Sequence, residues 1–241
     1  MILTAHQPTY LPWLGLFHKI AISDEYCFFD DVQYLVRDWN NRNKIKTANG
    51  DIWLTVPVLN KGYLDKKIRE IEINNSLNWR DKHWKSIYLS YKKAPYFNLY
   101  SDFFEDVYKK DWLYVTDLCE YMMKWLLKEL KINVKYYKAS ELNFEGYKSS
   151  LVLDMCKNLN ADTYIFGKLG ADYVDVESFT KENVNIYIQE YKHPEYNQLW
   201  GGFKSNMSII DLLFNMGPNS LDILMQNNIT KEELNNMFNY K

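Results

Sequence analysis

Residues 1–31 read MILTAHQPTYLPWLGLFHKIAISDEYCFFDD, and this stretch decides the fold class. The apolar run Ile2–Ala5 predicts a first strand, and Tyr26–Phe29 predicts a second. Between them, a His-Gln-Pro turn leads to Pro12, which can open a helix over Leu14–Ala21. A strand, a polar loop, a helix and a strand in this order indicate a parallel βαβ unit. We therefore expect an α/β protein.

The rest of the chain extends this pattern. Residues 38–50 are rich in Asn, Arg and Lys without apolar periodicity, which predicts a loop. Hydrophobic patterning predicts strands at 53–58, 68–73, 134–138, 163–167 and 184–191, and helices at 79–91, 97–108, 113–130 and 149–159. Capping patterns at 208–211 and 230–233 predict a helical C-terminal tail over about 208–240. We expect a single α/β domain over residues 1–241, with a mostly parallel or mixed sheet flanked by helices and a helical insertion at about 79–130.

Composition narrows the class of protein. The net charge is −2, from 29 basic and 31 acidic residues spread along the chain, so no concentrated positive field exists for nucleic acid. The three cysteines are isolated, which indicates reduced thiols and no zinc motif. No run approaches the ~18 apolar residues of a membrane span, and no signal peptide is expected. These features predict a cytoplasmic protein without a membrane span.

Polar residues that packing does not require follow two of the early predicted strands. The first polar segment, His6 and Gln7, comes directly after the first strand. The second segment, with Asp30, Asp31 and Gln33, follows the second strand. Ligands of parallel sheets bind at the carboxyl ends of strands, so His6 is a candidate general base. Asp31 is a candidate for orienting His6, and the others for substrate binding. A buried turn histidine and a solvated acidic turn are the structural alternatives.

Two later segments carry the same kind of residue. Arg and Lys among side-chain amides suit a phosphate or carboxylate, and the third segment, residues 38–44, contains Asn41, Arg42, Asn43 and Lys44, followed by Lys46. The fourth segment, residues 191–198, again places a histidine, a tyrosine and a glutamine beyond a predicted strand, at His193, Tyr196 and Gln198. An exposed basic loop and an ordinary surface loop are the structural alternatives here.

The motifs of these segments resemble those of the WbqC-like protein family. The run His6–Gly15, HQPTYLPWLG, is similar to the opening of that family. The resemblance continues through residues 30–33, 41–43, 53–58 and 88–97, and resumes at 191–198 and 208–217. It spans roughly residues 1–217.

The resemblance implies a role in bacterial surface glycans. Members of the family lie among O-antigen, capsule (surface polysaccharide) and flagellin-glycan gene sets, and their suggested role is transfer of an aminoacyl group, glycyl in particular, to a sugar amine. This implies an acyl or aminoacyl transferase that acts on a nucleotide-linked amino sugar in lipopolysaccharide or related synthesis. The donor would be a thioester or an aminoacyl carrier, and no metal is expected.

On that reading, each candidate residue receives a role. His6 removes the proton of the amine, with His193 as the competing base. Glutamine amides at positions 7, 33 or 198 would bind the developing oxyanion. Arg42, with Lys44 or Lys46, would hold a diphosphate, and tyrosine rings such as those of Tyr10 and Tyr196 would contact the base or sugar.

Other readings remain open. A strand-end His-x-Pro turn before a helix is distantly similar to nucleotidyltransferases such as pantothenate synthetase, which activate a small acid with ATP. Those proteins usually carry a second histidine three residues later, where this chain has Thr9. A third alternative is that the protein is not an enzyme and binds a glycan or a nucleotide sugar. A metal-dependent variant would use His6, Asp30 or Asp31 and His193, but no local ligand spacing supports it.

Overall fold

Five short strands pair in parallel to form one sheet in the order β5-β2-β1-β6-β7. The computed structural model describes residues 1–59 and 61–239 of the chain. The strands of the sheet are β1 (Ile2–His6), β2 (Glu25–Phe28), β5 (Lys135–Lys138), β6 (Thr163–Phe166) and β7 (Asn185–Ile188). The predicted α/β class and the parallel sheet are thereby confirmed.

The opening βαβ unit is present where the sequence predicts it. Helix α1 (Leu14–Ala21) connects β1 to β2, which pair from Leu3↔Glu25 to His6↔Phe28. The chain then adds β5 beyond β2, but places β6 and β7 on the other side of β1. The strand order therefore reverses at β1, and ligands of open parallel sheets bind at the carboxyl ends of the strands at such a reversal.

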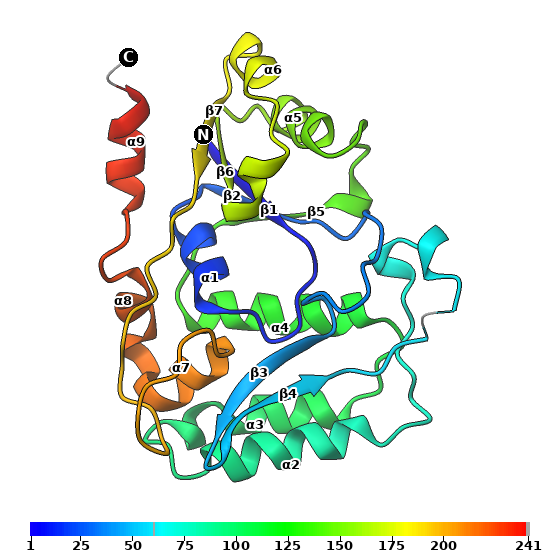
Figure 1. Ribbon diagram of the computed structural model, residues 1–241, viewed down its shortest axis with the longest axis vertical. Coiled ribbons are helices and arrows are strands. Elements are labelled where there is room, and N and C mark those ends of the chain that lie inside the picture. Colours follow the sequence, from blue (N-terminus) through cyan, green and yellow to red (C-terminus); the bar gives the residue numbers. More distant parts are fainter. Residues whose placement is uncertain (60, 240–241) are drawn as a thin grey trace.

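Helices lie on both faces of the sheet (Figure 1), and alternate side chains of the strands face these two layers. Leu3, Ala5 and Cys27 face one layer, where they pack with helices α5 (Ser149–Asn158) and α6 (Val176–Lys181). Tyr26 and Phe28 face the other layer, where they join the main core with α1 and α4 (Val115–Glu129). Each fully buried large apolar side chain contributes about 1.5–3 kcal/mol to folding.

Three long helices follow one another in the middle of the chain, as predicted. They are α2 (Trp79–Tyr91), α3 (Phe97–Lys109) and α4, and α2 packs against α3. In front of α2 and α3 lies an antiparallel hairpin of β3 (Arg42–Thr47) and β4 (Gly50–Thr55) (Figure 1). The prediction of a loop over residues 38–50 is therefore wrong from residue 42 onward, where β3 begins. The sequence did contain a sign of the hairpin, the pair Asn49-Gly50, which favours a tight hairpin turn.

Other sequence predictions also need correction. Residues 68–73 are not a strand, because Ile68–Glu70 form a 3₁₀ turn and only isolated bridges follow, at Glu72 and Ile73. The strand predicted at 53–58 begins earlier, at Gly50, and belongs to the hairpin rather than the sheet. Helix α6 was not predicted.

The C-terminal part is helical, with α7 (Ile209–Met216), α8 (Ser220–Met225) and α9 (Lys231–Asn239). The expected tail reached residue 240, which lies outside the described residues. Leu234 of α9 packs on Ile2 and Ile165 of the sheet. Within residues 1–59 and 61–239, none of the helices combines the length and the apolar composition needed to cross a membrane.

Gly217 ends α7 with a φ of 56°, and a Cβ there would collide with the ring of Tyr96. We predict that Gly217→Ala lowers the free energy of unfolding by about 3 kcal/mol or more, from left-handed strain plus overpacking. Gly62 is the matched control, because its φ is 70° but no atom of residues 1–59 and 61–239 lies within 4 Å of the place that a Cβ would occupy. Gly62→Ala should cost only about 1–2 kcal/mol. Urea denaturation of both variants checks this, and equal losses would contradict it.

Candidate functional site

His6 stands at the carboxyl end of the central strand. Its Nδ1 lies 2.8 Å from the carbonyl oxygen of Gln7, and the Thr9 hydroxyl approaches the same nitrogen at 3.4 Å. A proton on Nδ1 donates to that carbonyl, which leaves the lone pair on Nε2. Nε2 has no hydrogen-bond partner in the described part of the chain. The ring is half-buried and meets the edge of Trp13 at 5.2 Å between centroids.

The surroundings of His6 oppose its protonation. The pKa of His6 is lowered to about 3, first by burial and second by the positive charge of Lys19, while the bond to Gln7 opposes the shift. Lys19 projects from α1 and is only 4% exposed, and its Nζ donates to the Ala5 carbonyl at 2.9 Å. Burial lowers the pKa of Lys19 to about 7. His6 is therefore a neutral hydrogen-bond acceptor at physiological pH.

A row of three tryptophans leads from His6 to the hairpin. Trp13 lies 5.8 Å from Trp39, and Trp39 lies 5.4 Å from Trp53, between ring centroids. Trp53 is 43% exposed, and its ring carries the guanidinium of Arg42 at 4.6 Å and the Lys44 ammonium at 5.1 Å. We call Trp13, Trp39 and Trp53 the aromatic row. Half-exposed indole faces beside cations suit a planar or sugar ring that bears negative charge.

The asparagines of the third segment hold the backbone. Asn41 donates to the Val56 carbonyl at 2.7 Å, and Asn43, fully buried, donates to the Leu11 carbonyl. Asn40 donates to the Pro8 carbonyl at 2.8 Å and reaches the Gln7 amide oxygen at 3.5 Å. These bonds fasten the hairpin to the loop that follows β1, so the first and third predicted segments do meet.

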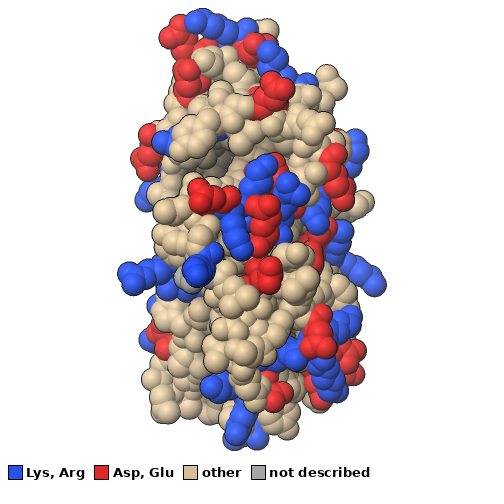
Figure 2. Space-filling view, turned by 90° about the vertical axis from the view of Figure 1, so that its right-hand side faces the viewer, with Lys and Arg blue, Asp and Glu red and all other residues tan. Residues whose placement is uncertain are grey.

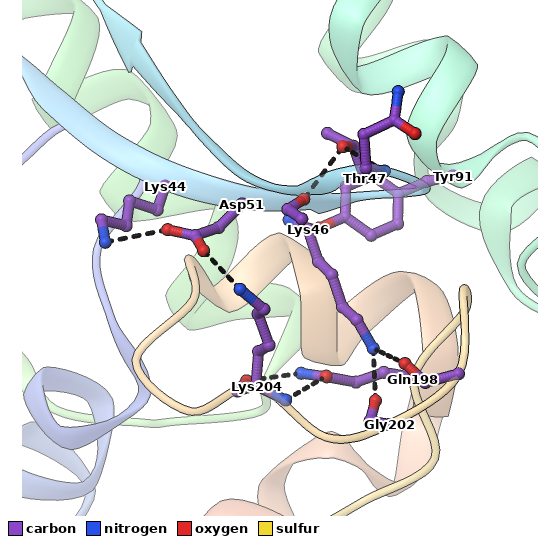
Figure 3. Close-up of polar contacts among 11 residues, drawn as sticks. Lys44, Lys46, Thr47, Asp51, Tyr91, Gln198, Gly202 and Lys204 are labelled. Carbon is purple, nitrogen blue, oxygen red and sulfur yellow. Dashed lines mark hydrogen bonds and ion pairs between the residues drawn. The ribbon is translucent and has the colours of Figure 1, made fainter.

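Lys46 points from the hairpin toward the loop that carries Gly202 (Figure 3). Its side chain is buried, and its Nζ donates to the carbonyls of Gly201, at 2.8 Å, and Gly202. Burial lowers the pKa of Lys46. In this structure Lys46 connects the hairpin to the loop 193–207 and is not presented to a ligand.

Lys44 is also bound within the protein, by an ion pair with Asp51. Asp51 of the facing strand binds Lys44 at 2.8 Å and Lys204 at 2.7 Å (Figure 3). The two ammonium groups hold the pKa of Asp51 well below its usual range. Among the cations of the third segment, Arg42 therefore keeps the greatest share of its charge for a ligand.

The fourth segment is organised by a buried carboxylate that the sequence analysis did not single out. Asp211 accepts hydrogen bonds from the hydroxyls of Tyr91, at 2.9 Å, and Tyr196, at 2.8 Å, and from the Gln198 amide at 2.8 Å. Burial raises the pKa of Asp211, and these donors oppose the shift. Gln198 also bonds the backbone of Lys204 in both directions, so its amide is fully committed.

His193 has both ring nitrogens occupied. Nδ1 lies 2.8 Å from the Pro194 carbonyl, and Nε2 accepts from the Asn206 N–H at 3.2 Å. Burial lowers the pKa of His193, while the bond to Pro194 and the charge of Asp211 oppose this. Within the described residues no contact joins His193 to His6. These contacts therefore do not bring the two candidate bases, His6 and His193, together.

The second segment forms a separate polar region. The Asp30 carboxylate is fully buried and accepts from the backbone N–H and the hydroxyl of Ser140, at 2.9 and 2.7 Å. Asp31 binds Lys67 at 2.6 Å and Arg69 at 2.7 Å rather than His6. Gln33 donates to the Leu64 carbonyl at 2.9 Å. The expected Asp31–His6 pair is therefore absent from these contacts.

An open cavity of about 610 Å³ lies beside Asp30, at the carboxyl ends of β2 and β5. Its lining includes Arg69, Asp117 and Lys138, and acidic and basic side chains gather in the middle of the face that Figure 2 shows. Thr116 also lines it, 1% exposed and with a hydroxyl that has no partner among the described atoms. Burial raises the pKa of Asp117.

Tyr10 lies in the protein interior. Its side chain is fully buried, and its hydroxyl bonds His83, at 2.8 Å, and Tyr108. The ring therefore packs between the opening loop and helices α2 and α3. Of the expected ligand-contacting tyrosines, Tyr10 and Tyr196 are both directed inward in this structure.

Comparison with known proteins identifies the family. A profile of the WbqC-like protein family matches residues 7–223. The chain belongs to the WbqC-like protein family. It is also similar to the uncharacterized protein Rv1507c of Mycobacterium tuberculosis (strain ATCC 25618 / H37Rv), with 34% identity over 220 residues, which cover 90% of this chain and 95% of that protein. No solved structure matches the chain.

Four residues of this WbqC-like protein gain importance only in the structure. Trp13, Trp39 and Trp53 form the aromatic row, and Lys19 lies beside His6. Their sequence positions carry no periodic signal, because residues 13, 39 and 53 belong to a loop, a turn and a hairpin. No three His, Cys, Asp or Glu side chains gather within the described chain to hold a metal ion.

We predict that the His6 ring stays neutral, with its proton on Nδ1, between about pH 5 and 8, where an ordinary histidine titrates. The folded pKa lies near 3 and the unfolded value is 6.5, so the unfolded state binds the proton first and His6 lowers stability as the pH falls below 6.5. Nitrogen chemical shifts of the imidazole test this. An inflection near pH 6.5 for His6 would contradict it.

We also predict that Asp211→Ala destabilises the protein by about 3–5 kcal/mol, because each buried donor left without an acceptor costs roughly 1–3 kcal/mol. Tyr196→Phe removes only one of the three donors and should cost about 1 kcal/mol. Urea denaturation measures both changes. The Asp211 variant should also make the loop 193–207 more sensitive to limited proteolysis, and a similar loss in both variants would contradict the shared role of the carboxylate.

Proposed function

We propose that the protein transfers an acyl or aminoacyl group to the amine of a nucleotide-linked amino sugar during the synthesis of a bacterial surface polysaccharide. The observation that supports this most directly is the position of His6. It stands at the strand-order reversal with Nδ1 bonded to a carbonyl and Nε2 without a partner among the described residues, in edge contact with Trp13, the first ring of the aromatic row. A sugar amine needs such an acceptor for its proton.

The proposed step has a simple balance. The amine nitrogen forms a bond to the acyl carbon, and the carbon–sulfur or carbon–oxygen bond to the carrier breaks. The amine proton passes to His6 Nε2 and then to the leaving thiolate or alkoxide. Gln7, adjacent to His6, is our candidate for binding the oxyanion, since the amides of Gln33 and Gln198 donate to other carbonyls.

The aromatic row supports the choice of a nucleotide-linked acceptor. An indole face that is 43% exposed at Trp53 can stack on a base, and Arg42 lies over that ring to meet a phosphate. The sugar would then extend along Trp39 and Trp13 toward His6. This path runs from the hairpin to the end of β1, the direction in which the rings are in contact.

We assign the cavity beside Asp30 to the acyl donor. The cavity opens at the end of β2, and β2 pairs with β1 up to His6↔Phe28, so it is one strand away from His6. The hydroxyl of Thr116, which has no partner among the described atoms, and the exposed carboxyl of Asp117 offer polar contacts to a polar donor such as an aminoacyl group. The three buried free cysteines, Cys27, Cys119 and Cys156, fit a reducing cytoplasm, where nucleotide sugars are used.

One observation favours a second enzyme reading. The strand order reverses at β1 and His6 follows it, as nucleotide-binding parallel sheets arrange their sites. On this reading the protein activates a small acid with ATP. Pyrophosphate release from ATP and the acid alone, without an amino sugar, distinguishes this activity from transfer.

The test is the mass of the glycan precursors in the host that lacks the gene. We expect nucleotide sugars, or surface glycan, lighter by one acyl or aminoacyl unit, because the amine stays free. The wild-type gene should restore the mass, and His6→Ala should not, with loss of at least about 10²-fold in activity for a missing general base. Leu169→Ala, at a side chain that is 77% exposed, is the control and should restore it.

Other outcomes separate the remaining readings. If the precursors keep their mass and only the amount of polymer falls, the transferase proposal fails and a non-enzymatic binding role takes its place. If His6→Ala restores the mass fully, the transferase survives but His6 is not its base.

A further inference from the structure

Lys19 is a buried cation without a counter-ion. Its side chain is 4% exposed and lies on α1, against the central strand. An ammonium has three donors, and one of them is used, on the Ala5 carbonyl at 2.9 Å. Throughout residues 1–59 and 61–239, no carboxylate lies within 4.0 Å of its nitrogen. Buried charges of this kind are costly and are normally paired.

Lys19 lies where the hydrogen-bonded pairing between β1 and β6 ends. Strand β1 pairs with β2 as far as His6↔Phe28, but with β6 only as far as Thr4↔Ile165. The Ala5 carbonyl falls just beyond the last pair with β6, and Lys19 takes it. The ammonium therefore lies at the opening between β1 and β6, where the strand order reverses. Phosphate groups of ligands bind at this point in open parallel sheets.

The charge of Lys19 also reaches His6, since it is one of the causes that lower the pKa of that imidazole. An anion beside Lys19 would cancel this influence and raise the basicity of Nε2. Binding of an anionic substrate would then improve His6 as a proton acceptor at the moment when it is needed.

We propose that the Lys19 ammonium binds a phosphoryl group of the substrate in the opening between β1 and β6. The two unused donors of the ammonium point to an acceptor with several oxygens, which a phosphoryl group supplies. Arg42 at the far end of the aromatic row is a separate cation, so the site differs from the one assigned to the nucleotide. The proposal rests on the proposed function only for the identity of the molecule that carries the phosphate.

The test is binding of inorganic pyrophosphate and of a nucleoside diphosphate by calorimetry, with no acyl donor present. Lys19→Met should weaken pyrophosphate binding by about tenfold or more, a factor worth about 1.4 kcal/mol. Lys85→Met removes an exposed lysine of α2 and should leave both affinities unchanged. A nucleoside diphosphate whose binding is weakened to the same extent by Lys19→Met identifies a nucleotide as the source of the phosphate. A nucleoside diphosphate that Lys19→Met leaves unaffected binds at the aromatic row, and the ligand of Lys19 is then a free phosphate compound.

Stability distinguishes this role from a structural one. A buried lysine that serves to bind a ligand destabilises the ligand-free protein, because its charge is buried without a partner. Lys19→Met should therefore raise the melting temperature of the ligand-free protein while it weakens pyrophosphate binding. A lysine that holds the fold together would lower the melting temperature instead. Unchanged pyrophosphate affinity in a folded Lys19→Met variant overturns the proposal.

A measurement on the unmodified protein covers the case in which the variant does not fold. Pyrophosphate should shift the imidazole nitrogen resonances of His6 and raise its pKa from about 3, because His6 senses the charge of Lys19. Resonances that do not move at saturating pyrophosphate overturn the proposal. Neither the pyrophosphate affinities nor the His6 resonances depend on acyl transfer, so both still test the Lys19 site if the proposed transferase activity is wrong.

Discussion

The arrangement of the site depends on one constraint, the unequal pairing of the central strand. Strand β1 is hydrogen-bonded on both sides, yet its two neighbours stop at different residues, Ile165 and Phe28. The pairing of β1 with β6 ends at Thr4, two residues before its pairing with β2 ends at His6, so the Ala5 carbonyl becomes available to Lys19 and His6 stands at an open edge. Because all five strands run in parallel, the polar ends of β2 and β5 lie on this same edge and supply the cavity beside Asp30.

Around this edge, the polar residues divide into those that hold structure and those that face outward. The asparagine side chains donate to backbone carbonyls, Asp51 binds two lysines and Asp211 accepts three hydrogen bonds. These contacts fasten the hairpin and the loop 193–207 to the core. Satisfied buried networks of this kind stabilise a single arrangement. His6, the aromatic row and Arg42 are different, since each keeps an unused face or atom. This division, rather than polarity itself, separates candidate ligand contacts from scaffolding.

Asp51 and Lys19 contribute to the pH dependence of the folding stability in opposite ways. Asp51, between two ammonium groups, gains stability from its ionised form above its unfolded pKa and loses it as the pH falls. Lys19 has the opposite effect, because burial opposes its charge: the cost is fully present below its folded pKa of about 7 and vanishes as the pH rises toward 10.5. A protein that retains such a residue at a strand-order reversal keeps a local weakness at the point where a ligand can relieve it.

The sequence by itself determined the α/β class, the opening βαβ unit, the long middle helices and the family, because hydrophobic period and local motifs encode them directly. It also located the polar residues at strand ends, His6 above all. It could not say which of them meet. Asp31 binds Lys67 and Arg69, and His193 bonds its own loop, because partners some ten to forty residues away are chosen by packing rather than by local pattern. Trp13, Trp39 and Trp53 become one surface, and Lys19 becomes a buried cation beside His6, only once the hairpin and α1 are packed against the end of β1.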